Sequence, residues 1–232
     1  MAEKLVAANV KATWFVTHRS PAVERLRQCP RLFELGLHPN FLPGSSHGDQ
    51  PREVLNYCLQ IVEDATSMRA HALMQSSPLL DEVCRHTAIN VDVSLFLPRA
   101  CNLQAVTHWA AERPLIRLPY FWEDDFEMIT PEPCWDVVSL TNKPGLKIFD
   151  FHPIHVFLNS SDSEPYEELK RRTGGDIQQA TVKDVDDIIC HGPGTASAFD
   201  SLLDALSGKG VFIRDLARTN GDPLASEGNG LK

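Results

Sequence analysis

The sequence predicts an α/β protein with a mainly parallel sheet and outer helices. Apolar segments rich in β-branched residues alternate with amphipathic segments along most of the chain. Two of the apolar segments end in His-Pro, at residues 38–39 and 152–153. With 232 residues, 43% of them apolar, the chain is long enough to bury a sizeable core. We therefore expect one domain over residues 1–218 and a disordered tail rich in Gly, Ser and Asn over residues 219–232.

Composition excludes several classes of function. The net charge of −9 argues against broad binding to nucleic acid or to an anionic membrane surface. No stretch approaches the roughly 18 apolar residues of a membrane helix. The six cysteines are scattered and form no CxxC pair, which indicates reduced thiols and neither a disulfide framework nor a thiolate zinc site. We expect a cytoplasmic protein without a membrane span.

The first part of the chain alternates helix and strand. Residues 2–8 have the composition of a helix end, and residues 11–17 form a strand rich in β-branched and aromatic residues. Ser20 as N-cap, followed by Pro21, predicts a helix that begins there. Residues 32–38 form the second strand.

The middle of the chain repeats this alternation. After a polar loop over residues 38–50, apolar residues recur at helical spacing between 54 and 62. Residues 67–72 predict a short strand with Arg69 and His71 on one face, because they are two residues apart. A helix over 79–87 and a strand over 90–97 follow.

The later elements are predicted from shorter signals. Residues 109–112 favour a helix, whereas residues 115–120, 137–140 and 211–213 favour strands. The stretch Phe149–Phe157 is apolar nearly throughout and predicts a buried strand that delivers two histidines at its end.

Polar side chains gather at the ends of these apolar segments. His38, His71, His152 and His155 all lie at or near such an end. A parallel sheet carries its chemistry in the crevice beyond the carboxyl ends of its strands, so two strands that end in His-Pro suggest one shared pocket. Each histidine could instead cap its strand by bonding nearby backbone.

The same inventory fits a metal-dependent hydrolase. Imidazoles together with a carboxylate from Glu123, Asp124 or Asp125 form a usual ligand set for a divalent metal, with zinc expected where histidine dominates. Water acidified by the metal attacks a carbonyl, an arginine stabilises the oxyanion, and a histidine protonates the leaving group. Arg69 could instead form a structural ion pair with Asp124 or Asp125, and Trp122 could be a core residue or a platform for a sugar. The sequence contains no HExxH motif.

Several of these segments resemble motifs of the polysaccharide deacetylases, the NodB-homology family of carbohydrate esterases. The strand Val10–Val16 resembles the family's V-K-A-T-F-F-V strand, and Glu34–Asn40 is similar to its E-[IL]-G-x-H strand. Phe149–His155 resembles a late strand that bears a catalytic histidine. Together with Arg69–His71 and Pro119–Asp125, the pattern is most similar to a divergent branch associated with bacterial surface polysaccharides, over roughly residues 1–159.

The resemblance implies a distorted (β/α) barrel of about seven strands and metal-dependent removal of N- or O-acetyl groups from a carbohydrate. It implies that His38 is the first metal histidine and that either His47 or His71 is the second. The family's arginine is Arg69 or Arg117, and His152 matches the late catalytic histidine; His155 has no clear counterpart.

The resulting candidate site has three groups of residues. The catalytic candidates are His152, His155, Arg69, Asp124 and Asp125. The substrate-binding candidates are Trp122, Tyr120, Arg117 and Asn40. The candidate metal ligands are His38, His71 and His47, for a divalent metal, with zinc expected.

One family motif has no match in this sequence. The family's first motif is an Asp-Asp pair at the end of a strand, and nothing upstream of Lys11 supplies it. We therefore expect a barrel that lacks one strand and has an open edge, with impaired or absent catalysis, unless Glu123, Asp124 or Asp125 substitutes. Two further functions stay open, namely a catalytically inactive carbohydrate-binding protein and a metal-dependent amidohydrolase that acts on small amides.

Overall fold

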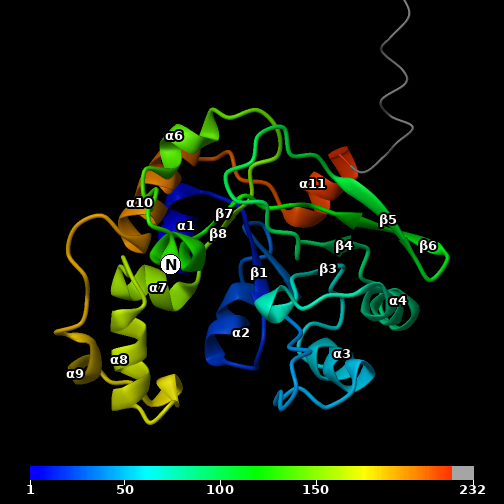
Figure 1. The fold of residues 1–232 in the computed structure, drawn as a ribbon, viewed down its shortest axis with the longest axis horizontal. Coiled ribbons are helices and arrows are strands. Elements are labelled where there is room, and N and C mark those ends of the chain that lie inside the picture. The colour runs from blue at the N-terminus through cyan, green and yellow to red at the C-terminus, as the bar shows by residue number, and fades with distance from the viewer. Residues whose placement is uncertain (221–232) are drawn as a thin grey trace, which may run out of the picture.

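The computed structural model describes residues 1–220, and the predicted tail lies, apart from its first two residues, outside the described residues. Its centre is a six-stranded sheet of order β1-β2-β3-β4-β6-β5 (Figure 1). The strands are β1 (Ala12–Val16), β2 (Phe33–Leu37), β3 (Ser67–Met68), β4 (Val91–Asp92), β5 (Val106–Ala110) and β6 (Arg113–Arg117). All neighbouring pairs are parallel except β5 and β6, which form an antiparallel hairpin. The predicted α/β class and mainly parallel sheet are therefore confirmed.

The connections between the parallel strands are helices whose starts are encoded locally. They are α2 (Pro21–Arg27), α3 (Pro51–Leu59) and α4 (Ser77–His86). The Ser20 hydroxyl accepts a hydrogen bond from the Val23 amide, and the Ser76 hydroxyl accepts one from the Leu79 amide. Each of these serines is an N-cap followed by a proline in the first turn, which satisfies an amide that the helix leaves unpaired.

The described residues also contain a two-stranded parallel sheet. It consists of β7 (Trp122–Glu123) and β8 (Phe149–Asp150). A parallel bridge between Phe96 and Tyr120 links the extension of β4 to the approach to β7. Within the described residues no barrel closes, so the predicted barrel of about seven strands is not confirmed; the structure shows a mixed α/β fold with a six-stranded sheet.

The stretch predicted as one buried strand over residues 149–157 is two elements. β8 ends at Asp150, and helix α7 (Pro153–Leu158) follows at once. His152 is the N-cap of α7 and Pro153 occupies the first turn, where its missing N–H costs nothing. The prediction of a strand beyond Asp150 was wrong because an apolar run of this length fits a short buried helix equally well.

Three shorter predictions are also corrected. Residues 109–112 complete β5 and turn into β6, with Ala111 and Glu112 at φ of 49° and 65°, and do not form a helix. The segment predicted as a strand at 137–140 lies in α6 (Val137–Thr141), whose N-cap Asp136 accepts a hydrogen bond from Ser139. The strand predicted at 211–213 is not formed, and α11 (Ile213–Asn220) begins there.

The structure contains further helices and short turns outside the two sheets. They are α1 (Ala2–Ala8), η1 (His71–Leu73), α5 (Asp124–Ile129), α8 (Glu164–Arg172), η2 (Ile177–Gln179), α9 (Val182–Val185) and α10 (Thr195–Leu206).

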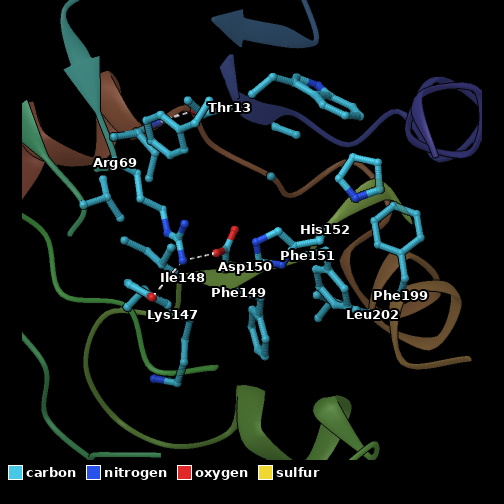
Figure 2. A pocket seen from close by; sticks show the side chains of 18 of the residues that line it. Thr13, Arg69, Lys147, Ile148, Phe149, Asp150, Phe151, His152, Phe199 and Leu202 are labelled. Atoms are coloured by element: carbon cyan, nitrogen blue, oxygen red, sulfur yellow. Dashed lines mark hydrogen bonds and ion pairs between the residues drawn. The ribbon is translucent and has the colours of Figure 1, made fainter. Parts of the chain in front are cut away.

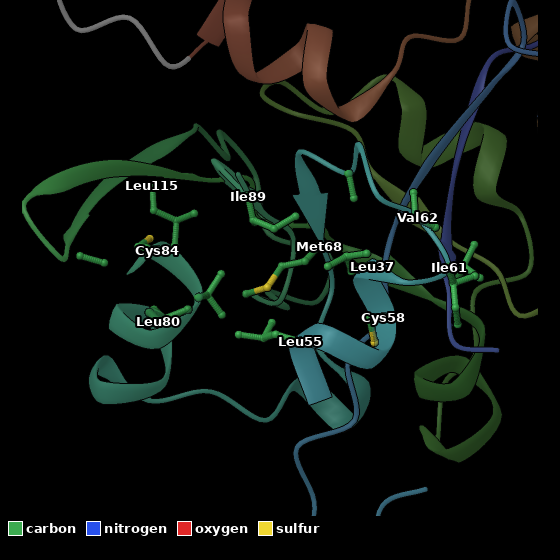
Figure 3. Packing of buried hydrophobic residues seen from close by; sticks show 14 of the residues in the cluster. Leu37, Leu55, Cys58, Ile61, Val62, Met68, Leu80, Cys84, Ile89 and Leu115 are labelled. Carbon is green, nitrogen blue, oxygen red and sulfur yellow. The ribbon is translucent and has the colours of Figure 1, made fainter. Parts of the chain in front are cut away.

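The hydrophobic core fixes the strand ends that carry the polar residues. Helices α3 and α4 pack their apolar faces on the sheet (Figure 3). Leu37 and Leu115 have no exposed surface, and Leu55 and Met68 are about as well buried. Burial of such a side chain stabilises the fold by roughly 1.5–3 kcal/mol. His38 and Arg69 come directly after Leu37 and Met68. Their backbone positions are therefore fixed by the packed core.

Candidate active site

A large cavity lies along β1 and β8 and reaches the carboxyl ends of β2 and β3 (Figure 2). Its volume is about 1770 Å³. The polar side chains that line it at this end come from segments far apart in the chain: His38, Arg69, His71, Tyr120, Asp125, Asp150, His152 and His155. The structure thus brings together the four histidines that the sequence places at the ends of apolar segments.

His38 and His71 face each other at one side of this cavity. Their ring centroids lie 5.5 Å apart, with the rings nearly perpendicular. The His38 amide bonds the carbonyl of Val16 at 3.0 Å, and the His71 amide bonds that of Pro39 at 2.9 Å, so backbone pairing fixes both residues. His71 lies in the η1 turn and not in a strand, but it lines the cavity beside His38, where the sequence predicts a shared pocket.

Electrostatics keep these two imidazoles neutral. Burial, reinforced by the positive charge of Arg69, lowers the pKa of His38 to about 3. Burial and Arg69 likewise lower the pKa of His71 below its ordinary value. The Nδ1 atom of His38 is buried and has no hydrogen-bond partner among the described residues. A neutral imidazole with a free ring nitrogen has the form that binds a metal ion.

His47, the other candidate for the second metal ligand, lies in a different cluster. Its Nδ1 accepts a hydrogen bond from the Asn40 amide at 3.2 Å, and its ring stacks on Tyr57 with centroids 4.6 Å apart. The Asn40 side chain accepts a hydrogen bond from the Leu42 amide at 3.0 Å. Neither His47 nor Asn40 lines the cavity, so both residues order the loop that follows β2.

The buried Asp124 pairs with the partly exposed His152. Asp124, the first residue of α5, has no exposed surface, and its Oδ1 lies 2.7 Å from Nδ1 of His152. Burial by itself lowers the pKa of His152, but the hydrogen bond and charge of Asp124, with Asp150 and Asp125, raise it to about 10. His152 is therefore an imidazolium at neutral pH.

Asp125 points toward the histidines of α7. Its Oδ1 lies 3.0 Å from Nε2 of His155, and its Oδ2 lies 3.7 Å from Nε2 of His152. Burial opposes ionisation, but the hydrogen bond from His155 and the charge of His152 lower the pKa of Asp125 overall. His155 is held from its other side by Ser160, at 3.2 Å.

Arg69 is the centre of a buried ion-pair network. It pairs with Glu123, with Asp150 at 2.8 Å, and with the hydroxyl of Tyr120 at 3.0 Å. The alternative partners considered from the sequence, Asp124 and Asp125, are not in this network. Tyr120 is fully buried, and it is one of the residues that line the cavity.

A group of donor atoms in the described residues could hold a metal ion. Glu123, Asp125 and His152 each offer one atom, and these atoms lie within 4.8 Å of one another. Burial raises the pKa of Glu123 to about 7, against the opposing charge of Arg69. Two of these donors, Asp125 and His152, line the same cavity as His38 and His71.

Besides Asn40, two more of the predicted substrate-binding residues do not line the cavity. Trp122 has no exposed surface, packs on Phe151 with ring centroids 4.7 Å apart, and donates its indole N–H to the carbonyl of Cys134. Arg117 pairs with the buried Asp92 at 2.8 Å across β4 and β6. We therefore leave Trp122 and Arg117 out of the proposed site.

The sequence analysis missed Asp150 as a member of the site. It lies one residue before the apolar Phe151 and pairs with Arg69. The signal was present, because a carboxylate in the apolar run Phe149–Phe157 is costly unless it is paired.

An α/β sheet whose strand ends hold imidazoles, carboxylates and one buried arginine around a deep cavity is the arrangement of a polysaccharide deacetylase-like protein. A family model described as WbmS-like polysaccharide deacetylase matches residues 1–170, and the chain belongs to this family. The resemblance that the strand motifs predict is thereby confirmed.

The structure is also similar to a crystal structure from Bordetella bronchiseptica. That protein, WbmS, is described as a candidate polysaccharide deacetylase involved in O-antigen biosynthesis. The two chains are 29% identical with a TM-score of 0.73, and the match covers 88% of this chain and 82% of that one. No curated protein matches this chain. Among the described residues, no helix has the length and apolar character needed to cross a membrane.

Proposed function

We propose that this protein is a metal-dependent hydrolase that removes acetyl groups, N- or O-linked, from a carbohydrate. Membership of the deacetylase family supports a carbohydrate substrate. The observation that carries the chemistry is the convergence of His38, His71, Asp125 and His152 on one cavity. The set combines neutral imidazoles, an ionised carboxylate and an imidazolium, which are the groups that acyl hydrolysis requires.

The donor set fits a divalent metal, with zinc as the expected ion. His38 and His71 supply two neutral imidazoles, one with a buried ring nitrogen that lacks a partner. Glu123, which belongs to the group of possible metal donors, would supply the third ligand. When bound, the ion acidifies a water molecule and polarises the acyl carbonyl.

The protein's own groups divide the proton transfers between them. His152 is charged at neutral pH and can donate its Nε2 proton to the leaving nitrogen or oxygen of the sugar, while Asp124 holds Nδ1. Asp125 is ionised and can accept the proton of the attacking water, with His155 fixing its second oxygen. Arg69 lines the cavity and orients Glu123 and Asp150 through its ion pairs.

The proposal is tested with purified protein and two substrate panels, N- and O-acetylated sugars and small cyclic amides, each with and without Zn²⁺. Acetate release from the sugars that stops with a chelator is the expected result. Hydrolysis of the cyclic amides alone favours an amidohydrolase. Sugar binding without hydrolysis, and without bound metal, favours an inactive carbohydrate-binding protein.

A further inference from the structure

We propose that the β5–β6 hairpin is a self-association surface, at which β5 of one chain pairs in the antiparallel direction with β5 of a second copy. The hairpin lies at the end of the six-stranded sheet opposite to β1 and projects from the body of the molecule (Figure 1). Antiparallel pairing of identical strands obeys a two-fold axis, so the same patch serves both copies. The inference does not depend on the hydrolysis proposed above.

The first observation is the direction of the backbone groups of β5. Thr107 lies opposite Ile116 of β6, and Trp109 lies opposite Pro114. The Ile116 amide bonds the carbonyl of Asn90, beside β4, at 2.9 Å, and Pro114 has no N–H. These two pairs are therefore the pairs of the hairpin without ladder hydrogen bonds. It follows that the N–H and C=O groups of Thr107 and Trp109 point to the free side of β5, where no described strand pairs with it.

The second observation is the character of this edge. β5 contains no charged residue and no proline, which are the usual devices that prevent an edge strand from pairing. Trp109 is 69% exposed and Val106 is 51% exposed. The two side chains are three residues apart and lie on opposite faces of the strand. A strand that pairs with this edge therefore covers apolar surface on both faces.

One register uses all the outward backbone groups of β5. When the two-fold axis passes beside His108, Thr107 of each copy lies opposite Trp109 of the other, and each of these two pairs exchanges two hydrogen bonds. A shift by two residues in either direction leaves only one such pair within β5. The same register sets Trp109 against the β-branched Thr107 of the second copy, which is a favourable cross-strand pair.

The charges at the two ends of β5 favour a second copy in the antiparallel direction. Glu112 is exposed in the turn after β5, and it has no ion-pair partner among the described residues. Lys147 lies near the other end, because its Nζ donates to the carbonyl of Gly145 at 2.8 Å, and Gly145 bridges Leu103. Lys147 has no carboxylate partner within the described part of the chain. Antiparallel pairing brings Glu112 of each copy toward the Lys147 end of the other, whereas parallel pairing brings like charges together.

The first experiment uses the full chain with one cysteine added to β5. His108→Cys places the new thiol beside the two-fold axis, where the facing Cα atoms lie about 4.5 Å apart and within disulfide range. Thr107→Cys is the matched control, because its two Cα atoms are offset along the strands beyond the roughly 7 Å that a disulfide spans. Mild oxidation should cross-link His108→Cys at least about tenfold more than Thr107→Cys or the wild-type chain, which both keep the six native cysteines.

Sedimentation measures the association itself. Because the contact consists of one strand, we expect a transient dimer whose share rises between about 1 µM and about 1 mM. Thr107→Pro removes an outward N–H and spares the ladder to β6, and Trp109→Lys adds a charge to the edge. Each should raise the dissociation constant at least about tenfold, with the circular dichroism of the wild type. Val182→Lys, at a site on α9 that is 71% exposed, is the control and should leave the association unchanged.

Four results would overturn the proposal. One is a monomer at every concentration, and another is equal cross-linking of the two cysteine variants. The third is an unchanged dissociation constant in both Thr107→Pro and Trp109→Lys, which would place the contact elsewhere. The fourth is slow hydrogen exchange of the Thr107 and Trp109 amides at every concentration, which would mean that another part of the same chain covers the edge. None of these results bears on acetate release.

Discussion

The Asp124 carboxylate contacts both the ring and the backbone of His152. Its Oδ1 lies 2.7 Å from the ring Nδ1, and its Oδ2 accepts the backbone N–H of His152 at 2.8 Å. Because Asp124 is fully buried, both the ring orientation and the ring charge depend on one carboxylate. The second contact fixes the backbone of His152, which is the N-cap of α7. Asp124 therefore holds both the start of this helix and the ring of its N-cap residue.

We expect Asp124→Asn to lower the pKa of His152 markedly from its value of about 10. The substitution removes the hydrogen-bonded charge of Asp124 and leaves the burial that disfavours the imidazolium, opposed only by the charges of Asp150 and Asp125. NMR titration of the His152 ring in metal-free protein measures the shift. Asp136→Asn, at the N-cap of α6 and away from the cavity, is the matched control. An unchanged His152 midpoint would show that Asp124 does not hold the charge.

The same substitution should reduce deacetylation at neutral pH by roughly 10²–10⁴-fold, the usual contribution of a general acid. The wild-type rate should stay flat on the alkaline side until the pH approaches 10, where His152 loses its proton, whereas the variant should lose activity at a lower pH. The pH profile of kcat/KM tests this. A variant that keeps the wild-type profile would remove His152 from the acid role.

Metal content distinguishes the two candidates for the second histidine ligand. His38→Ala and His71→Ala should each lower the bound zinc at least tenfold, because each removes one imidazole from the cavity. His47→Ala should retain the metal, because His47 stacks on Tyr57 outside the cavity. Elemental analysis of the purified variants, after dialysis against a weak chelator, makes the comparison. Loss of zinc in His47→Ala with retention in His71→Ala would reverse the assignment.

Arg69 should be important for stability as well as for the site. Arg69→Met leaves the carboxylates of Glu123 and Asp150 without their cation in a buried setting, which should cost about 3–5 kcal/mol of unfolding free energy. Arg171→Met removes a cation that is largely exposed and pairs with Glu168, so it should cost about 0–1 kcal/mol. Urea denaturation measures both. Similar values for the two variants would contradict the buried network.

Local signals predicted the parts of the fold that local interactions determine. The serine caps and prolines of α2 and α4 fix those helices, and the β-branched content of β1 fixes that strand, so all three are found where the sequence indicates them. The boundary between β8 and α7 was missed, because a short apolar run fits a strand and a buried helix equally well. The contact of His152, the N-cap of α7, with Asp124 is a long-range interaction, 28 residues apart, that a local pattern does not contain.

In the site, too, the sequence predicts some residues, whereas others depend on how distant segments fold together. His38, His71 and His152 could be selected because parallel strands bring their carboxyl ends together. The choice between His47 and His71 could not be made, since it depends on how the loop after β2 folds back on Tyr57. The partners of Arg69 were also beyond the sequence, because three consecutive acidic residues from 123 to 125 point in different directions once α5 begins.

The last prediction concerns two tryptophans with opposite surroundings. Trp122 has no exposed surface and packs among aromatic rings, so Trp122→Ala should cost about 3–5 kcal/mol of unfolding free energy. Trp109 on β5 is 69% exposed, so Trp109→Ala should change stability by about 0.5 kcal/mol or less. Thermal and urea denaturation provide the stability values, and sugar titration of the folded variants provides the binding values. Trp122→Phe, which keeps an aromatic ring but loses the indole N–H that Cys134 accepts, should leave sugar binding to the folded variant unchanged; a large loss of sugar affinity in folded Trp122→Phe would return Trp122 to the substrate site.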